Sequence, residues 1–298
     1  MNRIDAQRLL KNAPMKEYTS FKVGGAVKLL IFPESIDELT YAISVCKENE
    51  AQYYIMGKGS NLIVKENGYD GIIIKLSDYF NKILVKDDLI IAQSGALMSS
   101  LASKALQHSL SGLEFASGIP GTVGGAVVMN AGAYGGEMSH ITHKVKAIDA
   151  SGSEREFLNT ELNFGYRDSI FHHQPYVVLE VCLKLIKGEE KVIKNQMKEL
   201  ADKRNSKQPM NYPSAGSIFK RPQGHYASKL IEDAGLKGLS IGGARVSPLH
   251  AGFIINEGNA TSQDILDLIA IIQSTVQDKF NILLEPEVKI IGNDGSDT

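Results

Sequence analysis

The chain has 298 residues, of which 43% are hydrophobic and 22% charged, and its formal net charge is −2 at pH 7. At roughly 150 residues per domain, this composition predicts a globular protein of about two domains. The balance of 32 basic and 34 acidic residues excludes a general attraction to nucleic acid or to a membrane surface. The opening MNRIDAQRLLKNAP has no apolar signal core, and no later run approaches the ~18 apolar residues of a membrane span. We therefore expect a cytoplasmic protein.

Helical and extended patterns alternate over the first half of the chain. Apolar residues at helical spacing predict helices over 36–50 and 97–110. Short apolar runs predict strands over 53–56 and 71–76, and 82–93 is predicted as two strands about a polar turn. This alternation is typical of a protein that mixes helices and sheets.

The second half is predicted to contain three helices and several strands. Helices are predicted over 189–209, 226–234 and 262–280, the last of which opens with the capping box TSQD. Strands are predicted as a hairpin over 145–158, a strand over 176–186, a strand over 253–256 and a strand pair over 282–291. The strand over 176–186 has one predicted buried face, formed by Val177, Leu179, Val181, Leu183 and Leu185. A polar passage with prolines, around 204–214, is the predicted domain boundary.

The two cysteines are far apart in the sequence. Cys46 falls on the apolar face of the predicted helix 36–50, and Cys182 falls within the strand 176–186. We expect both to be small buried thiols in a reducing compartment.

Two glycine-rich segments indicate a ligand. The segment 118–137, GIPGTVGGAVVMNAGAYGGE, holds seven glycines and one charge, Glu137. A flexible linker would be polar, so the apolar residues of this segment predict a buried stretch shaped around a ligand. The segment 56–64, MGKGSNLIV, follows a predicted strand and also offers backbone N–H groups.

The segment 56–64 is the first glycine segment in chain order, and 118–137 is the second. The first segment matches the fingerprint of a dinucleotide-binding Rossmann unit poorly. Gly57 and Gly59 supply G-x-G, and Asp78 lies 19 residues beyond Gly59, but Leu62 stands in place of the third glycine. No amphipathic helix follows to receive a pyrophosphate. Either glycine segment alone predicts only a tight turn. The two together favour an extended dinucleotide between them, which physically suggests a flavin nucleotide.

Five motifs in a fixed order carry a family resemblance: MGKGSNLIV, SGIPGTVGGAVVMNAGAYGGE, GYRDSIF, SAGSIFKRP and LEPEV. Over 18–291 the chain resembles the UDP-N-acetylenolpyruvoylglucosamine reductase (MurB) family, in its shorter, type II form. The resemblance implies an α+β fold: a two-subdomain FAD-binding cradle, like that of PCMH and vanillyl-alcohol-oxidase proteins, and a C-terminal α+β substrate-binding domain. The implied domains are 1–77, 78–203 and 204–298. Whether the C-terminal strands stay in the last domain or return to the cradle is open.

The resemblance also implies the cofactors and the residues that bind them. FAD is the implied cofactor and NADPH the implied reductant. The implied FAD-binding residues are Gly57, Lys58, Gly59, Ser60, Asn61, Leu62, Gly121, Thr122, Gly124, Gly125, Asn130, Ala131 and Tyr134. The longer form of the family has an extra segment whose tyrosine closes over the substrate. This chain lacks that segment, so what closes its site is open.

The implied reaction reduces the enolpyruvyl group of UDP-N-acetylenolpyruvoylglucosamine and yields UDP-N-acetylmuramate, a peptidoglycan precursor. Hydride adds to the β carbon, so charge develops on the α carbon and its carboxylate. By resemblance, Arg167 clamps that carboxylate, Ser217 donates the proton to the α carbon, and Glu287 holds that centre or relays protons. Out of context, Arg167 beside Asp168 would be a surface ion pair, Glu287 an edge charge and Ser217 a turn residue.

Further residues are implied in substrate binding. Lys207, Lys220 and Arg221 form a basic set suited to the UDP diphosphate, although relatives often have Asn at the place of Arg221. Tyr166 is expected to pack against nicotinamide or substrate, or to belong to the core.

The histidines do not suggest a metal site. His140, His143 and the pair His172–His173 lack carboxylates at ligand spacing, so we predict no metal. We expect a monomer. Two alternatives remain open, an FAD-linked oxidase of another small substrate and a nucleotide-sugar binding protein without redox activity.

Overall fold

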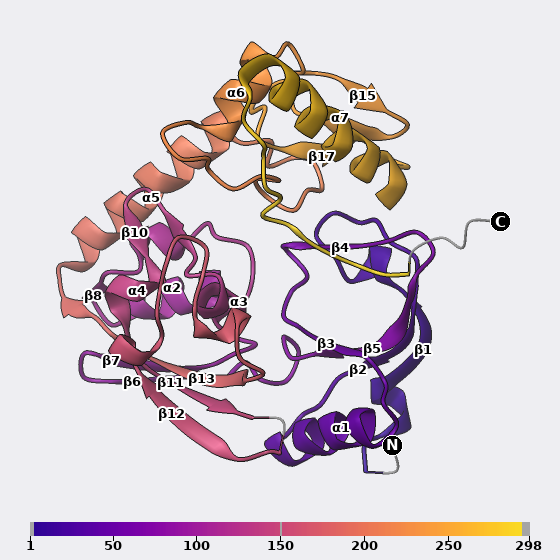
Figure 1. Cartoon of the computed structure of the whole chain (residues 1–298). Coiled ribbons are helices and arrows are strands. Elements are labelled where there is room, and N and C mark those ends of the chain that lie inside the picture. The colour runs from indigo at the N-terminus through magenta and orange to yellow at the C-terminus, as the bar shows by residue number, and fades with distance from the viewer. Residues whose placement is uncertain (1–2, 150, 294–298) are drawn as a thin grey trace. The chain divides into compact units, whose positions relative to one another are not determined.

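The computed structural model describes residues 3–149 and 151–293, which fall into two compact units. The first unit comprises the described residues of Met1–Leu10, Leu29–Lys58 and Gly71–Arg204. The second comprises those of Lys11–Lys28, Gly59–Asp70 and Asn205–Thr298. Helices and strands alternate along the whole chain, which confirms the predicted α+β class (Figure 1).

The described helices lie close to their predicted positions, with two short additions. The α-helices are α1 (Ile36–Glu48), α2 (Met98–Gln107), α3 (Val123–Val128), α4 (Met138–Ile141), α5 (Glu190–Lys207), α6 (Ala227–Asp233) and α7 (Ser262–Phe280). The additions, α3 and α4, fall within and just after the glycine-rich segment 118–137 and were not predicted.

The described strands include most of those predicted. Those from the first half are β1 (Leu9–Pro14), β2 (Ala26–Ile31), β3 (Tyr53–Met56), β4 (Leu62–Val64), β5 (Tyr69–Lys75), β6 (Ile83–Lys86), β7 (Leu89–Gln93), β8 (Leu110–Ser111), β9 (Gly132–Ala133) and β10 (Gly136–Glu137). Those from the second half are β11 (Thr142–Ile148), β12 (Glu154–Leu158), β13 (Val177–Lys184), β14 (Ile186–Lys187), β15 (Ser240–Ile241), β16 (Ala244–Val246), β17 (Ile254–Asn256) and β18 (Lys289–Ile291).

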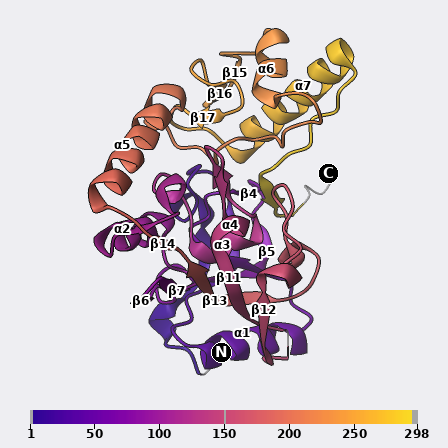
Figure 2. The same ribbon diagram turned by 90° about the vertical axis from the view of Figure 1, so that its left-hand side faces the viewer.

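An antiparallel five-stranded sheet, in the order β12-β11-β13-β7-β6, forms the main sheet of the first unit (Figure 2). The predicted single buried face of β13 is wrong. The consecutive residues Lys146 and Ala147 of β11 pair with Glu180 and Val178, so Leu179 is the extra residue of a β-bulge. A bulge shifts the alternation of side chains.

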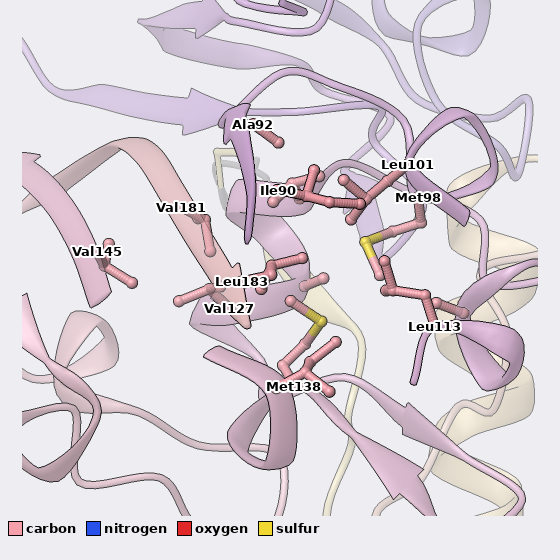
Figure 3. Packing of buried hydrophobic residues seen from close by; sticks show 14 of the residues in the cluster. Ile90, Ala92, Met98, Leu101, Leu113, Val127, Met138, Val145, Val181 and Leu183 are labelled. Atoms are coloured by element: carbon pink, nitrogen blue, oxygen red, sulfur yellow. The ribbon is translucent and has the colours of Figure 1, made fainter. Parts of the chain in front are cut away.

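The bulge divides the predicted face between two cores. Val177 and Leu179 join the cluster around α1, whereas Val181 and Leu183 join Val178 in the cluster beneath α2 and α3. Figure 3 shows the second of these clusters, in which side chains of α2, α3, β7 and β13 meet.

Helix α1 covers the first cluster. Ser35 caps its N-terminus by accepting a hydrogen bond from the Glu38 N–H, and its buried face includes the free thiol of Cys46. Cys182 is also free and buried, as predicted for both. The neighbouring strands β3 and β5 are parallel, in a sheet of order β1-β2-β5-β3. Strand β3 runs directly into the first glycine segment, which begins at Met56.

The second unit packs α6 and α7 with the antiparallel sheet β15-β16-β17. Helix α7 begins with the predicted capping box, in which Thr261 and Asp264 exchange side-chain to backbone hydrogen bonds of 3.1 and 2.9 Å. The predicted strand pair over 282–291 is wrong. Only β18 forms there, and it pairs in parallel with β4, the last three residues of the first glycine segment. Of the LEPEV residues, Pro286 forms a single antiparallel bridge with Phe219.

No helix in the described ranges combines the length and apolarity needed to cross a membrane.

Candidate active site

The two glycine segments touch within the first unit. Gly57 follows β3 directly, and a Cβ atom added to it would lie 2.3 Å from Thr122 Oγ1. No side chain fits in that space, so glycine at 57 is what allows the end of β3 to reach the second segment. Lys58, the next residue, is exposed.

The second segment begins with an N-cap rather than an open loop. Thr122 is buried and caps α3, with Oγ1 accepting from the Gly125 N–H at 3.4 Å. The N–H groups of Val123 and Gly124 donate to the carbonyls of Ala96 and Ser94, both at 2.8 Å. These two N–H groups are therefore already hydrogen-bonded within the protein. The second glycine segment thus offers a ligand fewer free N–H groups than its sequence predicts.

Gly124 and Gly125 are glycines for different reasons. A Cβ at Gly124 would lie 2.7 Å from Ser94 Cβ, so packing within the protein excludes a side chain. Gly125 is exposed, and a Cβ there would meet only Thr122 Oγ1, at 3.6 Å. Nothing in the described chain demands glycine at 125, although glycine in a helix costs about 1 kcal/mol relative to alanine. A bare backbone at this place fits the close approach of a ligand.

A buried hydroxyl lies beside these glycines. Ser94 is 3% exposed, and its Oγ has no hydrogen-bond partner among the described residues. Buried polar atoms are rarely left without a partner. The bare face of Gly125, the packed junction of Gly57 with Thr122 and this unsatisfied hydroxyl together fit a polar cofactor bound along the glycine segments.

The remainder of the second segment is fixed by side chains. Asn130 is 2% exposed and Ala131 is half-buried, and the backbone of Ala131 joins α3 to Met138 through hydrogen bonds. Tyr134 is 46% exposed and has a φ of 53°, so its ring stands clear of the core.

Arg204 of α5 is a residue of this site that the sequence analysis missed. It is 8% exposed, and its Nη1 donates to the Gly118 carbonyl at 2.5 Å. Burial lowers the pKa of its guanidinium, and the interaction with Tyr134 partly opposes that shift. Arg204 lies within the stretch predicted as a polar boundary, and helical spacing alone did not distinguish its buried position from the exposed lysines around it.

The YRDS motif forms a tight two-residue turn in the first unit. Gly165 and Asp168 exchange backbone hydrogen bonds of 3.0 and 3.3 Å, with Tyr166 and Arg167 between them. Arg167 has a left-handed φ of 55°, and both of its terminal nitrogens lie 3.4 Å from the Gly132 carbonyl. Tyr166 is 57% exposed, so the core alternative for this ring is wrong.

The expectation that His172 and His173 lack a nearby carboxylate is also wrong. Asp168 Oδ1 lies 2.9 Å from His172 Nδ1, and Asp168 Oδ2 lies 2.9 Å from His173 Nε2. Burial raises the pKa of Asp168, but the two histidines outweigh it and the net shift is downward. Among the described residues, no group of three or more His, Cys, Asp or Glu side chains is suited to hold a metal ion.

Three predicted site residues come together in the second unit. The extended segments around Ser217 and Glu287 run side by side, with a 2.7 Å hydrogen bond from the Glu287 N–H to the Ile218 carbonyl. Asn61 of the first glycine segment donates through Nδ2 to the Glu287 carbonyl at 3.1 Å. Ser217 Oγ donates to the Phe219 carbonyl at 3.2 Å. Ser217, Glu287 and Asn61, which are far apart in the sequence, are thus brought close through backbone contacts.

The other predicted residues of the first glycine segment are distributed along this stretch. Gly59 is buried with a φ of 69°, Ser60 is half-buried, and Leu62 is buried at the start of β4.

The basic set is less uniform than the sequence suggests. Lys220 forms an ion pair of 2.5 Å with Glu285, and the guanidinium of Arg221 lies 4.0 Å from the ring centre of Tyr226. Lys207, at the end of α5, is exposed and forms no ion pair with any residue in the described ranges. The residues just after it line a cavity of about 280 Å³, together with Pro248 and Leu249.

Comparison with known proteins identifies the class first. A family model described as FAD binding domain matches residues 27–157. This match and the glycine segments define an FAD-dependent oxidoreductase, as predicted. A second model, UDP-N-acetylenolpyruvoylglucosamine reductase, C-terminal domain, matches residues 208–291.

Curated relatives and a solved structure give the particular family. The reductase of this name from Clostridium tetani is 50% identical over 294 residues, covering 99% of this chain and 95% of that protein. The one from Alkaliphilus oremlandii is 48% identical over 286 residues, covering 96% and 94%. The crystal structure of the Thermus caldophilus reductase (MurB) is 36% identical, covers 95% of this chain and 97% of that one, and superposes with a TM-score of 0.81. The chain belongs to the UDP-N-acetylenolpyruvoylglucosamine reductase family, which confirms the resemblance and, with it, FAD as cofactor and NADPH as reductant.

Proposed function

We propose that this chain reduces UDP-N-acetylenolpyruvoylglucosamine to UDP-N-acetylmuramate with NADPH, a step in the synthesis of peptidoglycan precursors. The observation that carries the proposal within the molecule is the grouping of Ser217, Glu287 and Asn61 in the second unit. An oxidase of a small alcohol, or a protein that only binds a nucleotide sugar, has no need to bring this serine, this glutamate and this asparagine together.

When bound, FAD would supply hydride transfer from NADPH to the β carbon of the enolpyruvyl group. Within the first unit its binding residues are Gly57, Lys58, Gly121, Thr122, Gly124, Gly125, Ala131 and Tyr134. Within the second unit they are Gly59, Ser60, Asn61 and Leu62. The bare backbone at Gly125 and the tight junction at Gly57 support this assignment.

Arg167 binds the substrate carboxylate and stabilises the negative charge that spreads into it. A planar guanidinium can donate two parallel hydrogen bonds to a carboxylate, and such charge-assisted bonds are about twice as strong as neutral ones. The tight turn and the left-handed backbone of Arg167 support a fixed orientation of this side chain. Tyr166, exposed beside it, packs against nicotinamide or substrate.

Ser217 donates the proton to the α carbon, and Glu287 orients that centre or relays the proton. A serine hydroxyl is a weak acid, but the carbon it protonates carries enolate charge and is strongly basic. In this structure the hydroxyl donates to the Phe219 carbonyl at 3.2 Å, which is longer than a usual O–H···O hydrogen bond of about 2.5–3.0 Å. Turning from that carbonyl to the substrate therefore costs little.

Lys207 binds the diphosphate of the UDP group. It has no ion pair with any described residue, whereas Lys220 is paired with Glu285 and Arg221 lies over Tyr226. Lys220 and Arg221 would bind the diphosphate while already in contact with Glu285 and Tyr226. Lys207 has no such contact to give up among the described residues, so it is the cation best able to bind an anionic ligand. The cavity just beyond it, lined by Tyr212, Met210 and amide side chains, suits a flat base such as uracil.

The wider organisation is proposed on the same basis. The domains are an FAD-binding pair over 1–77 and 78–203 and a substrate-binding domain over 204–298, with the final strand β18 paired to β4 of the first. We also propose a cytoplasmic monomer, which sedimentation of the purified holoenzyme and fractionation of cells would test.

The test of the proposed chemistry separates the two half-reactions of a Ser217→Ala variant. Reduction of FAD by NADPH needs no proton at a substrate carbon, so stopped-flow absorbance should find it nearly unchanged. Reoxidation by the enolpyruvyl substrate should slow by about 10²–10⁴, the usual contribution of a positioned acid. Equal slowing of both half-reactions would make Ser217 a structural residue and would leave the proton to another group.

A further inference from the structure

The backbone that carries Arg167 adopts a conformation that needs support from its surroundings. A φ of 55° at a residue other than glycine is uncommon and costs of the order of 1 kcal/mol or more, so it persists only where neighbouring groups fix it. Within the turn, Gly165 and Asp168 exchange two backbone hydrogen bonds. The following residue, Ser169, is fully buried and donates to the Val128 carbonyl at 2.8 Å, which anchors one side of the turn to α3.

Asn130 anchors the other side. Its Nδ2 donates to the Gly165 carbonyl at 3.0 Å and to Glu137 Oε1 at 3.2 Å, and its Oδ1 accepts from the Ser139 N–H at 2.9 Å. Both amide hydrogens are therefore used within the chain. At 2% exposure this side chain also has almost no surface left for a ligand. These contacts join the Arg167 turn to the segment just after the β9–β10 hairpin.

Glu137 completes this connection. Besides Asn130, its Oε1 accepts a 2.5 Å hydrogen bond from Ser139 Oγ, and that hydroxyl is the largest influence holding the pKa of Glu137 below its usual value. The charge of Arg167 acts in the same direction. Glu137 pairs in the β9–β10 hairpin with Gly132, and the Gly132 carbonyl is the one that faces the Arg167 guanidinium.

We propose that Asn130 and Glu137 are positioning residues for Arg167: Asn130 holds the backbone of its turn, and Glu137 holds Asn130 and the strand that faces its guanidinium. This inference rests on the proposed role of Arg167 in binding the substrate carboxylate. It assigns Asn130 to the support of Arg167 in place of the contact with FAD expected from its motif.

The experiment measures the two half-reactions of the holoenzyme separately under anaerobic conditions. Enzyme is reduced with NADPH, then mixed with UDP-N-acetylenolpyruvoylglucosamine in a stopped-flow spectrophotometer. Asn130 has a left-handed φ of 39°, which aspartate tolerates. Asn130→Asp therefore keeps the shape, but it removes both donated hydrogens and replaces the bond to Glu137 by two neighbouring carboxylates. Reoxidation should slow about 10- to 100-fold, because small misplacements of a binding group cost this much, while FAD content stays at wild-type level. A reoxidation rate equal to that of the wild type would overturn the proposal.

A matched control tests whether the effect is only local destabilisation. Asn159 donates through Nδ2 to the carbonyls of Ser139 and Thr142, at 2.9 and 2.6 Å, and makes no bond to the 165–168 turn. Asn159→Asp therefore removes the same number of hydrogen bonds from the same neighbourhood. It should leave reoxidation within about twofold of wild type. Equal slowing by Asn159→Asp and Asn130→Asp would overturn a specific positioning role.

The reoxidation rate of an Arg167→Lys variant distinguishes failure of this inference from failure of the proposed role of Arg167. Unchanged reoxidation in Arg167→Lys alone would contradict the role of Arg167 itself. If that variant is slow, adding Asn130→Asp should cost less than about twofold more, because residues that act through a shared partner are not additive. Fully additive losses would overturn the positioning role while leaving that of Arg167 intact.

Glu137→Gln keeps the proposal testable if Asn130→Asp does not fold. This variant retains an oxygen that can accept from Asn130 but loses the charge that strengthens the bond. Reoxidation should slow about 3- to 10-fold with flavin reduction unchanged, since charge-assisted hydrogen bonds are roughly twice as strong as neutral ones. No change in reoxidation would remove Glu137 from the proposal.

Discussion

Gly124 and Gly125 are neighbours in α3, but only Gly124 is required to be glycine by packing within the protein. Alanine substitutions should therefore affect stability at 124 and FAD binding at 125. Gly124→Ala would force a Cβ to within 2.7 Å of Ser94 Cβ, so it should destabilise the apoprotein by about 1–3 kcal/mol, as overpacking does. Gly125→Ala meets only Thr122 Oγ1 at 3.6 Å and should leave stability unchanged or raise it by up to about 1 kcal/mol. Its affinity for FAD should nevertheless fall.

Urea unfolding of the apoproteins and fluorescence titration with FAD measure these two effects. A Gly125→Ala protein that binds FAD as tightly as the wild type would remove Gly125 from the cofactor site. A Gly124→Ala protein of wild-type stability would contradict the packing argument.

Arg8 and Glu38 form a largely buried ion pair that gives the stability a pH dependence. Their side chains are 12% and 13% exposed, and two hydrogen bonds join them. The bond to Arg8 is the largest cause of the lowered pKa of Glu38, whose ordinary value is 4.5. A lowered folded-state pKa means that the pair stabilises the fold above the ordinary pKa and that this contribution is lost as pH falls through the folded value.

Glu38→Gln should therefore destabilise the protein near pH 7, by about 1.5–3 kcal/mol for a hydrogen bond to a charged group. The gap between variant and wild type should narrow as pH falls below the ordinary value of 4.5, because the unfolded wild type then takes up a proton that the folded protein binds only at a lower pH. Denaturant unfolding at a series of pH values measures both. A gap that stays constant down to pH 3 would show that the charge of Glu38 is not the cause.

Helices and strands that show a clear apolar pattern in their own residues were predicted well. Features that depend on pairing with residues far away in the sequence were not. Helix α1 and helix α7 were identified because each carries an apolar face, and α7 also has its cap in the adjacent residues. Helix α3 was missed because two of its residues are glycines, which disfavour helix by about 1 kcal/mol each. Burial of Val123 and Val127 and the Thr122 cap outweigh that preference. The bulge at Leu179 was missed because it depends on pairing with β11.

The capping box of α7 provides a test at the level of one element. Thr261→Ala removes the acceptor for the Asp264 N–H at the start of the longest described helix. Loss of an N-cap side chain typically costs 0.5–2 kcal/mol, so we expect a loss of about 1 kcal/mol. Thermal unfolding measures it, with Thr160→Ala, at an exposed position in the first unit, as a control that should be near neutral. Equal effects of the two substitutions would show that the cap contributes nothing of its own.

At the scale of the whole molecule, the candidate site depends on residues that no local pattern could bring together. Asn61 and Glu287 are 226 positions apart, and β18 joins β4 across a similar interval. Charge, periodicity and spacing could suggest a ligand at the glycine segments, but only the family resemblance singled out Arg167, Ser217 and Glu287. The structure adds two contacts that neither the local patterns nor the family resemblance indicated. Asn130 donates a hydrogen bond to Gly165 in the Arg167 turn, and Arg204 is buried with a hydrogen bond to the Gly118 carbonyl.

The central claim is that bound FAD passes hydride from NADPH to an enolpyruvyl nucleotide sugar, and an anaerobic absorbance titration tests it most directly. The purified protein should be yellow, NADPH should bleach the flavin band, and UDP-N-acetylenolpyruvoylglucosamine should restore it in equimolar amount with UDP-N-acetylmuramate as product. A protein that stays colourless with added FAD would contradict both the reductase and the alternative of an FAD-linked oxidase. A reduced flavin that oxygen reoxidises but the nucleotide sugar does not would contradict the reductase and leave an FAD-linked oxidase.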